Sequence, residues 1–203
     1  MERILITGIK GFVGPYLKRE LEAHDFEVFG LGREEGSGNK YYQADILDAE
    51  RIAKIVAEVC PTHIAHLAGF SSPAEAEKQP QLVYNVNFRG TENVFIAAAG
   101  MKERPRILVV SSAHVYGQPK YLPITEEHPL KGKGAYAKSR IAQEMLVSDW
   151  RSELSINVAR SFNHTGPGQS DTMVLPKAAK QIVELKLGKR KALELGNIYL
   201  RRD

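Results

Sequence analysis

Short runs of apolar residues alternate along this chain with longer stretches in which apolar residues recur every three or four positions. The short runs are typical of buried strands, and the longer stretches are typical of helices that bury one side. Their regular alternation predicts repeated strand–helix units and a parallel sheet. The runs predict strands at Arg3–Thr7, Glu27–Leu31, Lys40–Gln43, His63–Leu67, Arg106–Ser111 and Ser155–Ser161. The stretches predict helices at Phe12–His24, Ala49–Val59, Gln81–Gly100 and Tyr136–Trp150.

Right-handed crossovers between such strands give an α/β fold of the Rossmann type, a doubly wound parallel sheet in three layers with helices on both faces. We expect this domain to occupy residues 1–161. The composition changes near Phe162, where a loop rich in glycine and proline begins. Beyond it we predict a helix at Met173–Leu187 and a short strand at Ala192–Leu195. We interpret residues 162–203 as the incomplete beginning of a smaller substrate-binding region, so that the chain is truncated.

Three glycines, Gly8, Gly11 and Gly14, lie between the first predicted strand and the first predicted helix. In dinucleotide-binding folds the first glycine permits a tight turn, and the second lets backbone amides approach a pyrophosphate. The third lets helix and strand pack closely. Because this triplet follows a strand and opens a helix, it predicts a dinucleotide site, to which the neighbouring Phe12 and Val13 also belong.

The end of the second predicted strand bears on the choice between NAD and NADP. An NAD site usually has an acidic residue there for the ribose 2′-hydroxyl, whereas this sequence has Gly32 followed by Arg33. A guanidinium holds a 2′-phosphate through charge-assisted hydrogen bonds, and Lys10 in the glycine turn adds a second cation. These residues favour NADP(H). In the alternative interpretation Arg33 is solvated, and Glu34 or Glu35 binds the ribose of NAD.

Composition and charge exclude several classes of protein. The net charge of +4 is mild, and no basic cluster is interleaved with aromatic residues, so nucleic-acid binding is not favoured. No apolar run approaches the roughly 20 residues that a membrane-spanning helix needs. No metal site is predicted. The one cysteine, Cys60, is predicted to be a small buried apolar residue, and its lack of a disulfide partner fits a reducing compartment. We expect a cytoplasmic protein.

Further motifs resemble the extended short-chain dehydrogenase/reductase family over essentially the whole chain. TGIKGFVG is similar to the TGxxGxxG turn of that family, and NVNFRGTENV resembles one of its helices. ADILD resembles the segment that contacts the adenine, which implies that Asp45 and Ile46 bind the cofactor. HLAG resembles the strand end beneath the cofactor ribose, which implies contacts from Leu67, Ala68 and Gly69.

The same resemblance implies a catalytic set. VVSSAHVYG is similar to the strand that carries the catalytic serine, here Ser112, and AYAKSR is similar to the helix start that carries the catalytic tyrosine, here Tyr136. The family pattern Tyr-x-x-x-Lys places Arg140 at the lysine position, one helical turn from Tyr136, as a catalytic and cofactor-binding residue. A guanidinium is bulkier than an ammonium and is essentially never deprotonated, so we expect this exchange to alter or reduce activity.

LPITEEHPL, RSFNHTGPGQS and VLPKAAKQI resemble the branch of the family that acts on GDP-linked mannose derivatives. This implies NADPH-dependent reduction of the 4-keto group of a GDP-linked 6-deoxysugar. Dehydratases of this branch usually carry a glutamate at the position of His114, so elimination lacks its expected base and reduction is favoured. The resemblance implies sugar contacts from Ser112, His114 and Tyr136. It also implies a cofactor contact from Phe162 and substrate contacts from Asn163, Val174, Lys177 and Arg202.

Two alternatives keep the same fold. A nucleotide-sugar epimerase or dehydratase would use the same serine and tyrosine, and net consumption of the cofactor separates reduction from epimerisation. A protein that binds NADP without catalysing a reaction would be consistent with Arg140. The resemblance further implies a homodimer through the helices at Gln81–Gly100 and Tyr136–Trp150, although packing on their own sheet explains their apolar stripes equally well.

Overall fold

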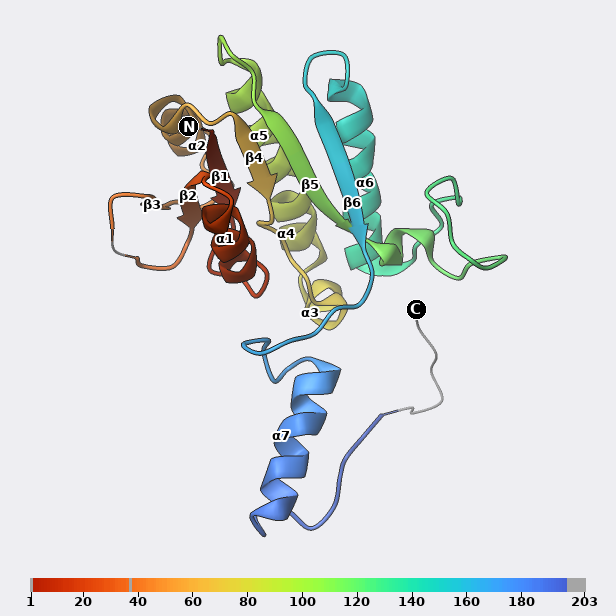
Figure 1. The fold of residues 1–203 in the computed structure, drawn as a ribbon. Coiled ribbons are helices and arrows are strands. Elements are labelled where there is room, and N and C mark those ends of the chain that lie inside the picture. Colours follow the sequence, from red (N-terminus) through yellow and green to blue (C-terminus); the bar gives the residue numbers. More distant parts are fainter. Residues whose placement is uncertain (1, 37, 197–203) are drawn as a thin grey trace. The chain divides into compact units, whose positions relative to one another are not determined.

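A computed structural model describes residues 2–36 and 38–196, and six parallel strands form its centre. The strand order is β3-β2-β1-β4-β5-β6 (Figure 1). Successive strands are therefore added to one side of β1 up to β3 and to its other side from β4 onward. This is the predicted doubly wound topology. The strands are β1 (Arg3–Thr7), β2 (Glu27–Gly32), β3 (Tyr41–Gln43), β4 (His63–His66), β5 (Arg106–Ser112) and β6 (Ile156–Ser161).

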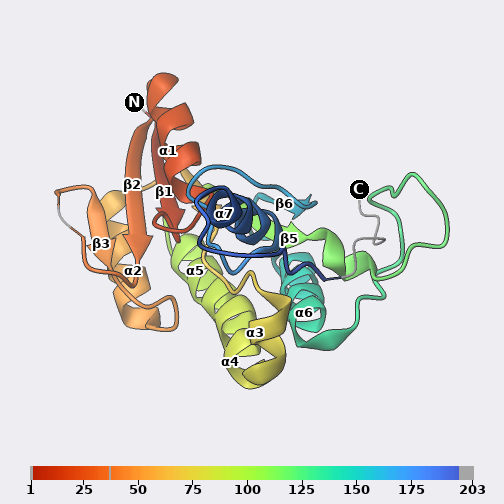
Figure 2. The same ribbon diagram turned by 90° about the horizontal axis from the view of Figure 1, so that it is seen from below.

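Alternation of side chains along β1 explains why both faces of the sheet are covered. Ile4 and Ile6 point to one face, where they pack with the helix α1 (Gly14–Ala23). Leu5 points to the other face, into the main core, which forms between the sheet and the helices that cover this second face. Figure 2 shows α1 on one side of the sheet and these helices on the other. They are α2 (Ala49–Val59), α5 (Gly90–Ala99) and α6 (Gly134–Trp150).

The segment predicted as a single helix at Gln81–Gly100 is helical throughout but changes its winding. It consists of α4 (Pro80–Tyr84), the π-helical turn η1 (Asn85–Arg89) and α5. Single π-turns inside α-helices are frequent at functional sites. A further helix, α3 (Pro73–Lys78), and the 3₁₀ turn η2 (Ala113–Tyr116) lie in segments for which no element was predicted.

The strand predicted at Ala192–Leu195 is wrong, because those residues form no strand. Glu194 pairs instead with a side chain of the helix α7 (Val174–Lys186). The Gln181 carboxamide accepts from Glu194 N at 2.7 Å and donates to Glu194 O at 3.1 Å. One glutamine therefore satisfies both backbone groups that a neighbouring strand would otherwise bind.

The prediction that Cys60 is buried is also wrong. The apolar stripe of α2 ends at Val59, and Cys60 follows as the exposed residue that terminates the helix. Its φ of +47° is left-handed, a conformation common at helix ends. The thiol hydrogen-bonds to the carbonyl of Ala57 at 3.0 Å.

The chain divides into two compact units, one ending at Ser161 and the next beginning at Phe162. The first unit contains the sheet, and the second contains α7. Across the described ranges, no helix combines the length and apolarity that a membrane crossing requires.

Ile55 lies fully buried in α2, facing the main core. We expect Ile55→Ala to lower the free energy of unfolding by about 2–5 kcal/mol, since it removes buried methylenes and leaves a cavity. Urea titration measures this loss. The exposed neighbour Lys54 provides the control, and Lys54→Ala is expected to change stability by less than about 0.5 kcal/mol. Equal losses in both variants would contradict this packing.

Candidate functional site

The glycine turn between β1 and α1 leaves no room for side chains at two of its three glycines. Gly8 has a left-handed φ of +70°, and a Cβ there would lie 2.8 Å from Ala68 N. A Cβ on Gly14 would lie 2.0 Å from the carbonyl oxygen of Ile9. The third glycine thus lets α1 begin against the backbone of the turn itself. Gly11 N donates to Gly8 O at 2.9 Å and closes the turn.

Phe12 and Val13 complete this turn. The Phe12 ring is half-buried and meets the edge of Tyr16 on α1 at 5.7 Å between ring centroids. Val13 is exposed where α1 begins. Their proposed cofactor contacts stay predictions.

The loop that follows β2 is held by three successive backbone carbonyls. The carbonyl of Arg33 accepts from Gln43 Nε2 at 3.0 Å, that of Glu34 from the Tyr41 hydroxyl at 2.5 Å, and that of Glu35 from Lys10 Nζ. Burial, with a smaller effect of the Glu34 carboxylate, raises the pKa of Tyr41 and keeps its hydroxyl a donor. The loop is therefore fastened to the glycine turn and to β3.

Arg33 itself is exposed on this fastened loop. Its guanidinium has no hydrogen bond or ion pair with another residue in the described ranges. The Glu34 carboxylate lies close to Gly32, because a Cβ on that glycine would be 3.0 Å from Glu34 Oε2. Both the cation of the NADP interpretation and the acid of the NAD interpretation are thus near the end of β2.

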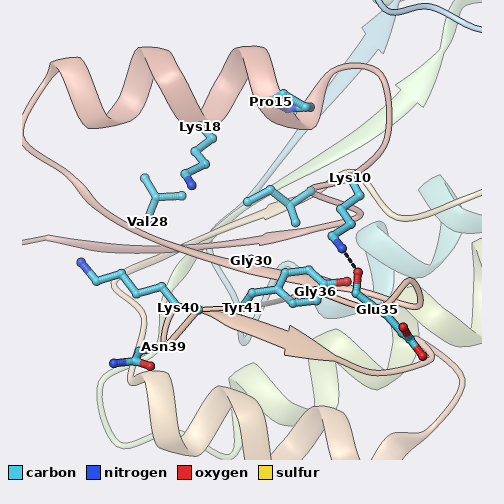
Figure 3. Close-up of a pocket in the computed structure, with 12 residues that line it drawn as sticks. Lys10, Pro15, Lys18, Val28, Gly30, Glu35, Gly36, Asn39, Lys40 and Tyr41 are labelled. Carbon is cyan, nitrogen blue, oxygen red and sulfur yellow. Dashed lines mark hydrogen bonds between the residues drawn. The ribbon is translucent and has the colours of Figure 1, made fainter.

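A cleft of about 600 Å³ lies between α1 and the edge formed by β2 and β3 (Figure 3). Lys10, Lys18 and Lys40 contribute cations to its wall. Lys10 Nζ also lies 4.4 Å from the centroid of the Tyr41 ring, within cation–π range. The residues predicted to be catalytic do not line this cleft.

The predicted adenine segment follows β3. Asp45 is exposed, and its Oδ1 accepts from Leu47 N at 2.9 Å. Ile46 is buried, and its carbonyl accepts from Asn93 Nδ2 at 3.0 Å. A Cβ on Gly90 of α5 would lie 2.7 Å from Ile46, so this segment packs directly on α5.

The end of β4 lies beside the end of β1. Leu67 N donates to Thr7 O at 3.1 Å, and Ala68 N donates to Thr7 Oγ1 at 3.1 Å. A Cβ on Gly69 would lie 2.7 Å from Asn87 Oδ1. The predicted ribose-binding residues are therefore adjacent to the glycine turn, as the parallel sheet requires.

A buried histidine, His66, joins β4 to the neighbouring strand β1 and to the helix α5. Its Nδ1 lies 2.8 Å from Thr7 Oγ1, and its Nε2 lies 2.9 Å from Thr91 Oγ1. Burial and, secondarily, the charge of Arg140 lower the pKa of His66 to about 3. Thr91 donates its proton to the Asn87 carbonyl at 2.6 Å, so Nε2 must donate to Thr91 and Nδ1 must accept from Thr7. The network assigns one neutral tautomer.

Ser112, His114 and Tyr136 come together where β5 ends and α6 begins. Ser112 Oγ lies 3.2 Å from His114 Nδ1 and accepts from His114 N at 3.2 Å. The His114 ring meets the Tyr136 ring edge-on at 5.6 Å. Ser112 and Tyr136 are both mostly buried. The structure thus groups the three residues predicted to contact the sugar.

The helix α3 holds the beginning of α6, which carries Tyr136. Glu77 Oε1 accepts from Ala135 N at 2.7 Å, which supplies a negative charge and an acceptor at the helix N-terminus. Ser139 Oγ donates to the Tyr136 carbonyl at 2.7 Å and accepts from Asn87 Nδ2 at 2.8 Å. Tyr136 is therefore positioned by Glu77, Ser139 and Asn87, residues to which the sequence analysis assigned no role.

Arg140 is buried and lies on the face of α6 that carries Tyr136, 5.6 Å from its ring. Its Nη1 donates to the Val110 carbonyl at 3.0 Å and to Gln143 Oε1 at 2.9 Å. Its Nη2 donates to the Phe70 carbonyl at 2.9 Å. The guanidinium thus binds the backbone of β5 and of the segment after β4.

Sequence reasoning missed a second buried charge in this region. Glu144 on α6 binds the Arg160 guanidinium, with Oε2 2.7 Å from Nη2, and accepts from Ser111 Oγ at 2.5 Å. This hydrogen-bonded carboxylate raises the pKa of Arg160. An acidic residue within an otherwise buried helical face was the signal available in the sequence.

The remaining predicted contacts belong to the second unit. Phe162 and Asn163 begin that unit, and Val174 and Lys177 lie in the first turn of α7. Arg202 lies outside the described residues. These substrate and cofactor contacts stay predictions.

Comparison with known proteins decides the family. The family model described as GDP-mannose 4,6 dehydratase matches residues 5–203. The chain belongs to this GDP-mannose 4,6-dehydratase family. A curated family relative, the GDP-6-deoxy-D-mannose reductase of Pseudomonas aeruginosa, is 34% identical over 100% of this chain and 66% of its own length. The predicted family and Rossmann-type fold are confirmed.

Solved structures agree with this assignment. RMD from Pseudomonas aeruginosa, complexed with NADPH, superposes with a TM-score of 0.87 at 34% identity, covering 100% of this chain and 68% of that one. UDP-glucose 4-epimerase of Thermus thermophilus, in complex with NAD, superposes with a TM-score of 0.76 at 27% identity over 83% of this chain and 58% of that one. The chain therefore spans between 58% and 68% of the length of these three relatives.

The depressed pKa of His66 makes stability depend on pH. Because the folded pKa of about 3 lies below the unfolded value of 6.5, the unfolded state binds more protons. The stability that this group contributes is complete above pH 6.5 and falls towards pH 3, by up to about 1.4 kcal/mol per pH unit. We expect His66→Gln to be less stable at neutral pH but to show a flatter dependence between pH 6.5 and 5, measured by urea titration.

The exposed His24 on the surface of α1 provides the matched control. His24→Gln is expected to keep the wild-type slope over the same pH range. An unchanged slope in His66→Gln would show that this buried histidine does not set the acid sensitivity.

Proposed function

We propose that this protein reduces the 4-keto group of a GDP-linked 6-deoxysugar with NADPH. The observation that carries the proposal is the grouping of Ser112, His114 and Tyr136 at the carboxyl end of the sheet. The glycine turn lies at the same edge, because Thr7 pairs with His66 in the register of β1 and β4. In open parallel sheets ligands bind at this edge, where the strand order reverses.

The residues of the turn fit a dinucleotide. At Gly8 and Gly14 a Cβ would collide with the backbone of Ala68 and of Ile9, so only glycine permits the tight turn that a pyrophosphate site needs. Arg33 would hold the 2′-phosphate, and Lys10, fastened at Glu35, would place a second positive charge beside it. The NADPH complex of RMD, the structural relative at 34% identity, supports this choice of cofactor.

Bound NADPH would supply a hydride to the C4 carbon of the sugar. Tyr136 would donate its phenolic proton to the carbonyl oxygen, and the Ser112 hydroxyl would hold that oxygen by a hydrogen bond. Both groups come from rigid elements, β5 and α6, which fixes their geometry before substrate binds. His114 would orient Ser112 through the 3.2 Å contact at Nδ1.

Reduction is favoured over dehydration by the residue that follows β5. Elimination of water needs a base beside the sugar, and dehydratases of this branch are expected to use a carboxylate at the position of His114. His114 instead contacts both Ser112 and Tyr136, the two residues that act on the carbonyl. This arrangement favours a role for His114 in binding the carbonyl oxygen together with Ser112 and Tyr136, and not a role as the base of an elimination.

We also propose a homodimer and a cytoplasmic location. Apolar side chains are exposed on the helices predicted to form the interface, and they are Leu82, Tyr84, Ile96 and Met145. Exposed apolar side chains on these helices favour contact with a second copy of the chain. The one cysteine, which has no internal disulfide partner, supports a reducing compartment.

The cofactor preference provides one prediction. We expect Arg33→Ala to weaken NADPH binding by on the order of tenfold or more while leaving NADH binding nearly unchanged, because only NADPH carries the 2′-phosphate. Fluorescence titration of the full-length protein measures both affinities. Arg104→Ala, in the turn before β5, is the control and should change neither. Equal weakening of both cofactors would contradict the assigned role of Arg33.

The reaction itself provides another prediction. With a GDP-4-keto-6-deoxysugar, the full-length protein is expected to oxidise NADPH and to form the 4-hydroxy sugar. Tyr136→Phe and Ser112→Ala should each lower kcat about a hundredfold or more, whereas Tyr42→Phe in β3 should retain activity. Interconversion of sugars without consumption of NADPH would identify an epimerase. Tight NADPH binding without any turnover would identify a binding protein.

A further inference from the structure

In the described part of the chain the Arg140 guanidinium forms three hydrogen bonds, all through Nη1 and Nη2, whereas its buried Nε has no partner there. Two of its acceptors are backbone carbonyls, Val110 at 3.0 Å and Phe70 at 2.9 Å, and the third is Gln143 Oε1 at 2.9 Å. Only about 5% of the residue is exposed. Arg140 therefore joins β5, α6 and the segment after β4 at one point.

The segment after β4 is fixed from two sides. Phe70 N donates to Asn87 Oδ1 at 2.9 Å, while the carbonyl of Phe70 accepts from Arg140. A Cβ on Gly69 would lie 2.7 Å from Asn87 and 2.8 Å from Arg140 Nη2, so both side chains lie against this glycine. Phe70 in turn packs against the small cluster formed by Ala76, Val83 and Tyr136.

Arg140 thus reaches Tyr136 by two routes. The guanidinium lies 5.6 Å from the Tyr136 ring, and Phe70, whose carbonyl it binds, packs against the cluster that contains this ring. A planar guanidinium offers donors in a fixed fork, whereas an ammonium is a single point on a flexible stem. A lysine at this position would keep the positive charge but would not span carbonyls on two separate elements.

We propose that Arg140 is a positioning residue for Tyr136, acting through its fork to the Val110 and Phe70 carbonyls, and that lysine cannot replace it. This inference rests on the proposed function for its effect on turnover. It reverses the simplest expectation from the family pattern, in which lysine would improve the enzyme. The fork makes arginine the residue that this particular site needs.

The first test compares wild type with Arg140→Lys by NMR of ¹³C-labelled tyrosine, which needs no substrate. The Tyr136 resonance, assigned with Tyr136→Phe, is expected to shift and broaden in Arg140→Lys as the ring loses its fixed neighbours. Lys138→Arg, an exchange at an exposed position of the same helix, should leave it unchanged. An unaltered Tyr136 resonance in Arg140→Lys would overturn the proposal.

Turnover is measured on the same variants. We expect Arg140→Lys to lower kcat by on the order of tenfold to a hundredfold, with a much smaller change in the KM for the sugar, as small displacements of a catalytic group produce. Equal or higher kcat in Arg140→Lys would overturn the proposal. If wild type shows no turnover while the Tyr136 resonance still changes, the positioning role stands and the proposed reductase function fails.

Phe70→Ala tests whether Arg140 acts on Tyr136 through Phe70. It also keeps the proposal falsifiable if Arg140→Lys folds poorly. Phe70 is only half-buried, and its backbone carbonyl remains in the variant. Phe70→Ala is expected to shift the Tyr136 resonance and to lower kcat in the same direction. The double variant should lose less than the product of the two separate effects, because both act on one contact. Independent, multiplicative losses would contradict a shared route.

Discussion

Burial of His66 between Thr7 and Thr91 is the interaction from which the arrangement of this site follows. All three side chains are almost completely excluded from solvent, so each polar atom must find its partner inside the protein. The partners come from β1, β4 and α5. These elements carry the glycine turn, the predicted ribose-binding segment and the base of the π-turn. Satisfying one buried histidine therefore fixes three parts of the site relative to one another.

The network continues from Thr91 to α6, the helix that carries Tyr136. Gln143 donates to Thr91 at 2.7 Å and accepts from Arg140 at 2.9 Å, so α6 is bound to the same buried chain of hydrogen bonds. In the low dielectric of a protein interior such bonds are stronger, and an unpaired member is costly. The order of donors and acceptors leaves His66 a single neutral tautomer. At the carboxyl edge of the sheet this chain of hydrogen bonds therefore adds to apolar packing, although the buried Nε of Arg140 has no partner among the described residues.

Much of the fold could be predicted from the sequence because its signals are periodic. The buried stripe of α2 and the short apolar strands produced bounds close to those observed. The strand at Ala192–Leu195 failed because a glutamine side chain can replace a strand as hydrogen-bond partner, which no local pattern reveals. The helix α3 was missed because six residues carry too few apolar positions for a periodic signal.

In the candidate site too, some features could be predicted from sequence motifs and others could not. The grouping of Ser112 and Tyr136 could be predicted because the motifs that carry them resemble those of a known family. The partners of Arg140 were not, because two of them are backbone carbonyls, which every residue possesses. A sequence shows which cation stands at a position but not whether its donors face a ligand or the chain. Here Nη1 and Nη2 bind the chain, which, under our proposal, makes an apparent departure from the family pattern a requirement of this particular backbone. The positive charge beside Tyr136 is retained, while the two Nη groups of Arg140 bind the backbone carbonyls of Val110 and Phe70.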